Sequence, residues 1–80
     1  MDSASIRTQF GAQKLRIRTA KGDSAFVYFI LESHEGVTAY STLPNQVGDP
    51  HRDLELCFAP EFADEVERIL ESLGSIVTRL

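Results

Sequence analysis

The alternation of apolar and polar residues along this chain predicts four short strands. The segment KLRIR, residues 14–18, places Leu15 and Ile17 on one face and its basic residues on the other. LELCF alternates in the same way, whereas VTAYSTL is rich in β-branched and aromatic residues. The expected strands span residues 14–19, 37–43, 54–58 and 76–79.

Two helices are expected between these strands. In GDSAFVYFILESHEG, Asp23 or Ser24 can cap the first amides, and Gly36 can end the helix in the left-handed conformation. After Pro60, an apolar stripe recurs at helical spacing until Gly74. The members of this stripe are Phe62, Val66, Ile69, Leu70 and Leu73. The pattern predicts helices over residues 23–35 and 61–73.

The order strand, helix, strand, strand, helix, strand predicts an α+β fold, the ferredoxin-like βαββαβ plait. Right-handed crossovers then give a four-stranded antiparallel sheet of order 4-1-3-2, with both helices on one face. Residues 1–9 are polar and lack periodicity, so we expect a disordered leader followed by a single domain over residues 10–80.

Composition narrows the classes of protein that this chain could represent. Its 80 residues carry a net charge of −4, which argues against a general nucleic-acid binder. One cysteine excludes an internal disulfide, and no apolar run approaches the roughly 20 residues of a membrane span, so we expect a cytoplasmic protein. A chain this short buries little surface, which favours self-association.

The first helix is apolar nearly all round, because the seven residues from Ala25 to Leu31 are all apolar or aromatic. One of its faces, expected to lie on the sheet, holds Phe26, Phe29, Ile30 and Ser33. A second face holds Val27, Tyr28 and Leu31. Either the second helix covers this second face within the monomer, or a neighbouring subunit does.

The second strand favours a neighbouring subunit. VTAYSTL has no charge and no proline before Pro44, and an unguarded edge of this kind invites pairing with another chain. A two-fold axis at this edge would give a homodimer with one continuous sheet. The expected interface residues are Val27, Tyr28, Leu31, Thr38, Tyr40 and Thr42.

Residues capable of chemistry are few, and we predict no catalytic residue, no metal site and no cofactor. Asp49, His51 and Asp53 fall within five residues, but this spacing indicates a polar turn rather than a cation site. Cys57 has neither a neighbouring histidine nor a CxxC partner, and His34 is expected to stabilise a helix end.

The basic first strand could serve an RNA-binding plait, which stacks bases on aromatic residues of its central strands. Here those strands offer Arg16, Arg18, Glu55 and Cys57 instead, so nucleic acid is not the expected partner. We expect Arg16 or Arg18 to pair across strands with Glu55.

Two families resemble this sequence. LRIRTAKGDSAFVYFILESHEGVTAY, with Gly22 at the junction of loop and helix, resembles the first half of ACT domains, which are regulatory modules that bind amino acids. That resemblance implies side-by-side dimers. The segments AFVYFILESHEGV, APEF and ADEVERILESL look like an uncharacterised bacterial family of similar length, domain of unknown function family 4911, which brings no known activity.

The expected function is that of a non-catalytic binding or regulatory module, a homodimer with a possible small-molecule effector such as an amino acid. A small anion would sit at the amides of Gly22, Asp23 and Ser24, unless the Asp23 carboxylate occupies them as a cap. The alternatives are a protein-interaction subunit without a ligand and an RNA-binding plait.

Overall fold

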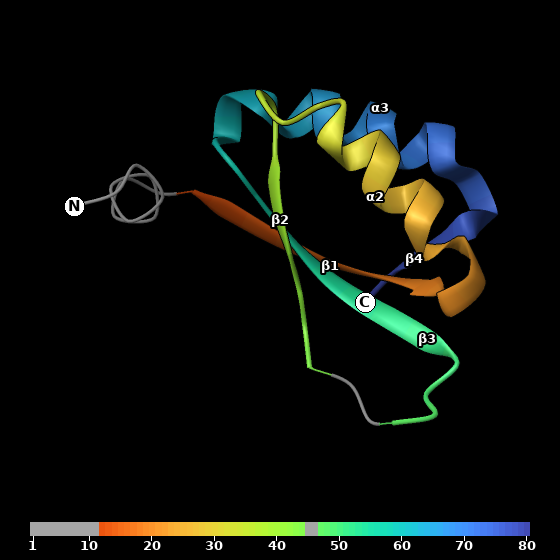
Figure 1. The fold of residues 1–80 in the computed structure, drawn as a ribbon. Helices are drawn as coiled ribbons and strands as arrows, with labels where there is room; N and C mark the ends of the chain where they lie inside the picture. Colours follow the sequence, from red (N-terminus) through yellow and green to blue (C-terminus); the bar gives the residue numbers. More distant parts are fainter. Residues whose placement is uncertain (1–11, 45–46) are drawn as a thin grey trace.

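The computed structural model describes residues 12–44 and 47–80 of the chain. The elements follow one another in the expected order (Figure 1). They are β1 (Gln13–Ala20), η1 (Lys21–Asp23), α2 (Ser24–Glu32), β2 (Ala39–Thr42), β3 (His51–Phe58), η2 (Pro60–Phe62), α3 (Ala63–Leu73), η3 (Gly74–Ile76) and β4 (Val77–Arg79). The expected leader, residues 1–9, lies outside the described residues.

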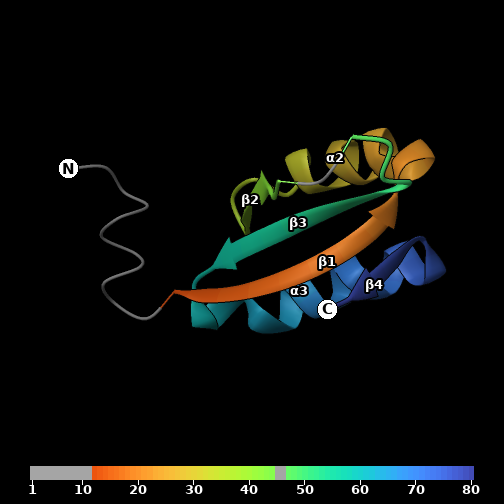
Figure 2. The ribbon, with the colours of Figure 1, turned by 90° about the horizontal axis from the view of Figure 1, so that it is seen from below.

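The four strands form one antiparallel sheet in the order β2-β3-β1-β4, which reads 4-1-3-2 when counted from the β4 edge. Both helices lie on the same face of this sheet, and Figure 2 shows the other face uncovered. In that view α2 lies over the β2 and β3 side and α3 over the β1 and β4 side. This two-layer α+β arrangement is compatible with a ferredoxin-like plait.

The core lies between the sheet and the two helices. β1 and β3 contribute their alternate residues, as the period of two requires, and α3 contributes a stripe at helical spacing. The buried apolar residues are Ile17, Val27, Leu31, Leu54, Leu56, Phe58, Val66, Ile69, Leu70 and Leu73. The inward faces predicted for the central strands and for the second helix are therefore confirmed.

The prediction of which face of the first helix lies on the sheet was wrong. Val27 and Leu31 have no exposed surface, whereas Phe26 and Phe29 are 50% and 66% exposed. Because the stretch is apolar all round, its periodicity does not select a face. The observed rotation places Val27 and Leu31 above one another on the sheet, and it brings the ring of Tyr28 against β2.

The first helix is also shorter than predicted. It ends at Glu32, because the amide of His34 donates to the carbonyl of Leu31 in a tighter turn. The Ser33 hydroxyl also donates to the carbonyl of Ile30. Gly36 does not have the positive φ angle that was expected of it. Among the described residues, positive φ angles occur at Gly48 and Gly74. Gly74 does end the second helix, with a φ of 59° that favours glycine.

Two strand boundaries differ from the prediction for reasons of pairing. β3 begins at His51 rather than residue 54, because its register with β1 extends to the pair Ala20 and His51. β2 begins at Ala39 rather than residue 37, because the amides of Val37 and Thr38 both donate to the carbonyl of His34. The alternation of apolar and polar residues does not predict either the extent of the strand register or these main-chain hydrogen bonds.

Neither helix in the described part of the chain has the length and apolarity needed to cross a membrane. The helices pack against the sheet instead.

The packing of α2 predicts opposite results for two substitutions on the same helix. Leu31→Ala leaves a cavity in the core and should lower the free energy of unfolding by about 2–4 kcal/mol. Phe29→Ala, the matched control on the outer face, should change it by less than about 1 kcal/mol. Urea denaturation followed by circular dichroism measures both, and equal losses would contradict the observed rotation of α2.

Candidate functional site

The residues expected to hold an anion, Gly22, Asp23 and Ser24, lie where β1 passes through η1 into α2. The expected cap is not formed: Asp23 makes no side-chain hydrogen bond at the helix start, and the Ser24 hydroxyl donates backwards to the carbonyl of Lys21 at 2.8 Å. The Ser24 amide is also taken, because it donates to the same Lys21 carbonyl. The three amides therefore do not form a common anion site.

A cavity of about 270 Å³ lies beside η1, where the ends of β1, β3 and β4 meet. Its polar lining comes from five elements, which belong to three separate parts of the sequence: β1 with η1, β3, and η3 with β4. The lining includes Arg18, Asp23, His51, Ser75, Thr78 and Leu80. The sequence pointed to Asp23 as part of an anion site and to Arg18 and His51 for other roles, but it did not predict that they share a cavity, because only the sheet pairing brings them together.

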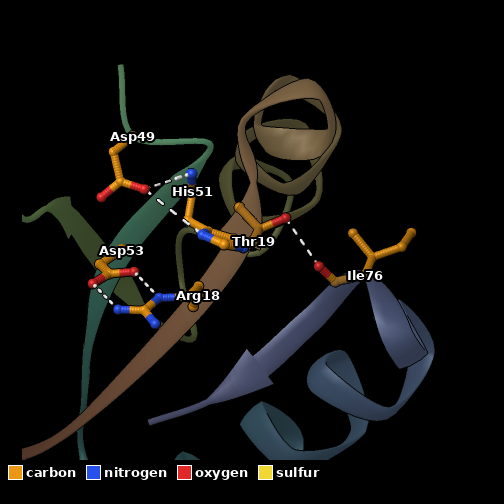
Figure 3. A network of polar contacts seen from close by, with 6 residues as sticks. All are labelled: Arg18, Thr19, Asp49, His51, Asp53 and Ile76. Atoms are coloured by element: carbon orange, nitrogen blue, oxygen red, sulfur yellow. Dashed lines mark hydrogen bonds and ion pairs between the residues drawn. The ribbon is translucent and has the colours of Figure 1, made fainter. Parts of the chain in front are cut away.

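Arg18 and Asp53 form the strongest polar contact beside this cavity (Figure 3). The Arg18 guanidinium donates from Nε to Asp53 Oδ1 at 2.8 Å and from Nη2 to Oδ2 at 3.0 Å. Such a two-pronged contact holds both side chains in one orientation. The hydrogen bond from Arg18 and the arginine charge lower the pKa of Asp53 below its ordinary value.

The polar turn expected around Asp49 is present. Asp49 Oδ1 accepts a hydrogen bond from the main-chain amide of His51 at 2.9 Å, and the His51 ring nitrogen Nδ1 lies 3.7 Å from the same oxygen. Asp53 turns away to Arg18, so these three side chains do not converge on one point (Figure 3). Within residues 12–44 and 47–80, no group of three potential metal ligands is gathered.

The basic residues of β1 line the uncovered face of the sheet, but acidic residues of β3 lie opposite them. Glu55 Oε2 accepts a hydrogen bond from Arg16 Nε at 3.4 Å, and Lys14 Nζ lies 3.8 Å from Oε1 of the same carboxylate. The predicted pairing of Arg16 with Glu55 is confirmed, whereas Arg18 takes Asp53 instead. At the outward positions of β1 and β3 there is no Phe, Tyr or Trp on which a base could stack.

Three of the residues expected at a subunit interface are buried within the single chain. Val27 and Leu31 have no exposed surface and belong to the core. Thr38 is 3% exposed, and its hydroxyl donates to the carbonyls of Ala39 and Cys57. These residues therefore belong to the interior of the single chain, where Val27 and Leu31 pack in the core between α2 and the sheet.

The other three expected interface residues remain at the surface near the β2 edge. The rings of Tyr28 and Tyr40 stack with centroids 5.6 Å apart, which ties α2 to β2. The Tyr40 hydroxyl donates to Glu32 Oε1 at 2.8 Å, and this hydrogen bond raises the pKa of Tyr40. Thr42 is exposed at the end of the strand.

No protein family model, curated protein or solved structure matches this chain. The resemblances to ACT domains and to domain of unknown function family 4911 therefore stay predictions.

The lowered pKa of Asp53 predicts a pH-dependent contribution to stability. A carboxyl whose pKa is lower in the folded state stabilises above its unfolded pKa, and that contribution is lost as the pH falls through the folded pKa. Asp53→Asn should therefore lower the free energy of unfolding at pH 7 but have progressively less effect below about pH 4. Both groups are solvated, so the effect should be small.

Urea titrations of the wild type and Asp53→Asn across this pH range measure the effect. The same substitution in an Arg18→Gln background is the control, and it should show no such pH dependence. A loss that is equal at pH 7 and pH 2 in the wild-type background would contradict the assignment.

Proposed function

We propose that this chain is a small non-catalytic binding or regulatory module that works as a homodimer joined through the outer edge of β2. The observation that carries this proposal is that β2 presents main-chain groups at an edge with no charged residue and no proline. The proposal keeps Tyr28, Tyr40 and Thr42 near the interface and leaves the buried Val27 and Leu31 to the core.

The hydrogen bonds of β2 indicate which groups its edge presents. The amide of Leu43 donates to the carbonyl of Asp53 at 2.9 Å, in the same register that pairs Ser41 with Glu55. In an antiparallel ladder, residues two apart point to the same neighbour. The main-chain groups of Tyr40 and Thr42 therefore point away from β3, toward the open edge.

This edge is complementary to itself. A two-fold axis at Ser41 would place Tyr40 opposite the partner's Thr42, and both residues carry outward main-chain groups. That register would form about four main-chain hydrogen bonds. No charged side chain of β2 would meet its own copy, and the two four-stranded sheets would become one continuous sheet.

The opposite edge of the sheet is less suited to pairing. β4 has only three residues and carries Arg79, which pairs with Glu67 of α3. A charged residue at a short edge strand opposes the addition of another strand. The difference between the two edges supports β2 as the place of association.

Side-by-side association is also what the resemblance to ACT domains implies. The shared features are the order of elements, a glycine at the start of the first helix and an uncovered sheet face. These features support a ferredoxin-like, ACT-like plait that pairs through its second strand.

Light scattering over a hundredfold concentration range tests the dimer with one matched pair of substitutions. Thr42→Lys places a charge next to the proposed axis and should shift the protein toward the 8.9 kDa monomer, weakening dimerisation by tenfold or more, on the order of 1.4 kcal/mol. Thr78→Lys makes the same change on β4 and should leave the dimer intact. A wild type that stays monomeric throughout would refute the proposal.

A second candidate function is the binding of a small metabolite with a carboxylate or phosphate group in the cavity beside η1. The observation that favours it is that Ser75 and Thr78 line the same cavity as Arg18, whose guanidinium is already oriented by Asp53. Asp23 adds one carboxylate to this lining. An amino acid is the kind of ligand that the resemblance to ACT domains implies.

Titration of the labelled protein with amino acids and with phosphate tests this candidate. Amide shifts at residues 18–24 and 75–78 should move together, and Thr78→Val should weaken binding several-fold by removing a hydroxyl. The absence of any shift at millimolar ligand would exclude the site.

A further inference from the structure

The outer face of α2 is an exposed apolar surface that neither the core nor the β2 edge uses. Phe26 and Phe29 are 50% and 66% exposed, and no charged residue occurs in α2 before Glu32. Two phenylalanine rings one turn apart on a helix form a continuous patch. Exposed patches of this kind in small proteins mark interaction sites more often than isolated apolar residues do.

The direction of this patch separates it from the β2 edge. With about 100° between successive helix residues, Phe29 lies about 180° from the midline between Val27 and Leu31. It therefore faces away from the sheet, while Tyr28 lies on the flank beside β2. Pairing through β2 would leave Phe26 and Phe29 uncovered.

A groove lies in the same helix layer. It has a volume of about 360 Å³ and runs between the turn that follows α2 and the facing side of α3. Its lining residues are His34, Glu65, Arg68, Ile69 and Ser72. α2 and α3 lie on the same face of the sheet (Figure 2), so the helix layer holds both the exposed phenylalanines of α2 and this groove.

The charge around this surface is acidic. Helix α3 carries five acidic residues and one arginine between residues 61 and 71 when its η2 turn is included. Glu67 is directed to Arg79, and Glu71 lies beside the same arginine on the β4 side of the helix. Asp64 and Glu65 are exposed, and Glu65 lines the groove together with Arg68. A second copy docked through this layer would bring two acidic α3 helices together, and like charges at a rim oppose association.

We propose that the outer surface of the helix layer, formed by α2 and α3, binds an amphipathic helix of another protein, with apolar residues on one face and lysine or arginine along its flanks. Phe26 and Phe29 supply the apolar contact, and the acidic residues of α3 attract the basic flanks. Binding of the apolar face of an amphipathic helix to an exposed apolar surface is a recurring mode of peptide recognition. The inference stands independently of pairing through β2.

A designed amphipathic peptide of leucine and lysine, about 18 residues long, is a direct probe. We expect it to bind the labelled protein, with amide shifts concentrated in residues 25–34 and 64–72 and an affinity that falls as salt rises. The matched peptide with glutamate in place of lysine should bind at least about tenfold more weakly.

Three variants assign the contact to this surface. Phe29→Ser should weaken binding of the leucine and lysine peptide at least about tenfold. Leu80→Ser, which changes another apolar residue that is 56% exposed, should leave it unchanged. The double variant Asp64→Asn and Glu65→Gln, which removes two exposed carboxylates of α3, should weaken binding several-fold and reduce its salt dependence.

Three results would overturn the inference. They are equal binding of the two peptides, shifts confined to the uncovered sheet face, and an unchanged affinity of Phe29→Ser. A second copy as the occupant would show as a mass in light scattering that Phe29→Ser lowers in the absence of peptide. Repeating the titration on Thr42→Lys separates this site from β2 pairing, because the peptide should bind that variant equally well.

Discussion

The antiparallel pairing of β1 with β3 is the interaction on which the rest of the structure depends. All eight residues of β1 have partners on β3, and the two strands occupy the centre of the sheet. One side of this pair places Ile17, Leu54 and Leu56 under the helices. The other side forms the contacts of Arg16 with Glu55 and Arg18 with Asp53. A slip of one residue would exchange the two sides, burying the charges and exposing the core.

Much of the fold could be predicted because the positions of apolar and polar residues show the period of two of the central strands and the helical period of α3. Alternation marked both central strands, and the amphipathic stripe of α3 between Pro60 and Gly74 marked the second helix with its ends. Connection rules then placed β1 and β3 at the centre and β2 and β4 at the edges. Each of these inferences rests on a contrast between apolar and polar positions, which local sequence records.

The orientation of α2 could not be predicted because that contrast is missing there. With every residue from Ala25 to Leu31 apolar, several rotations bury a similar amount of surface. Stacking of Tyr28 on Tyr40 and the hydrogen bond from Tyr40 to Glu32 accompany the observed rotation, and both depend on a strand later in the chain. The assignment of Val27 and Leu31 to an interface was wrong for the same reason, since the faces were exchanged.

The candidate sites were only partly predictable, for a different reason. The β2 edge follows from composition and topology, so the half-buried Tyr40 and the exposed Thr42 could be placed on it from the sequence. The cavity beside η1 was not, because it is assembled from β1, β3 and the segment around β4. Thr19 shows how such places form: its hydroxyl donates to the carbonyl of Ile76 at 3.0 Å, joining residues 57 positions apart in sequence (Figure 3).

The two helices of this layer differ in a way that folding alone does not require. In a two-layer domain a helix can bury only the stripe that faces the sheet, and its outer face remains in water. α3 follows this rule, with acidic residues outside and Val66, Ile69 and Leu73 inside. α2 buries an equivalent stripe through Val27 and Leu31, so Phe26 and Phe29 add nothing comparable to the core. Their exposed apolar surface on an otherwise two-layered domain is the observation on which the proposed helix-binding surface rests.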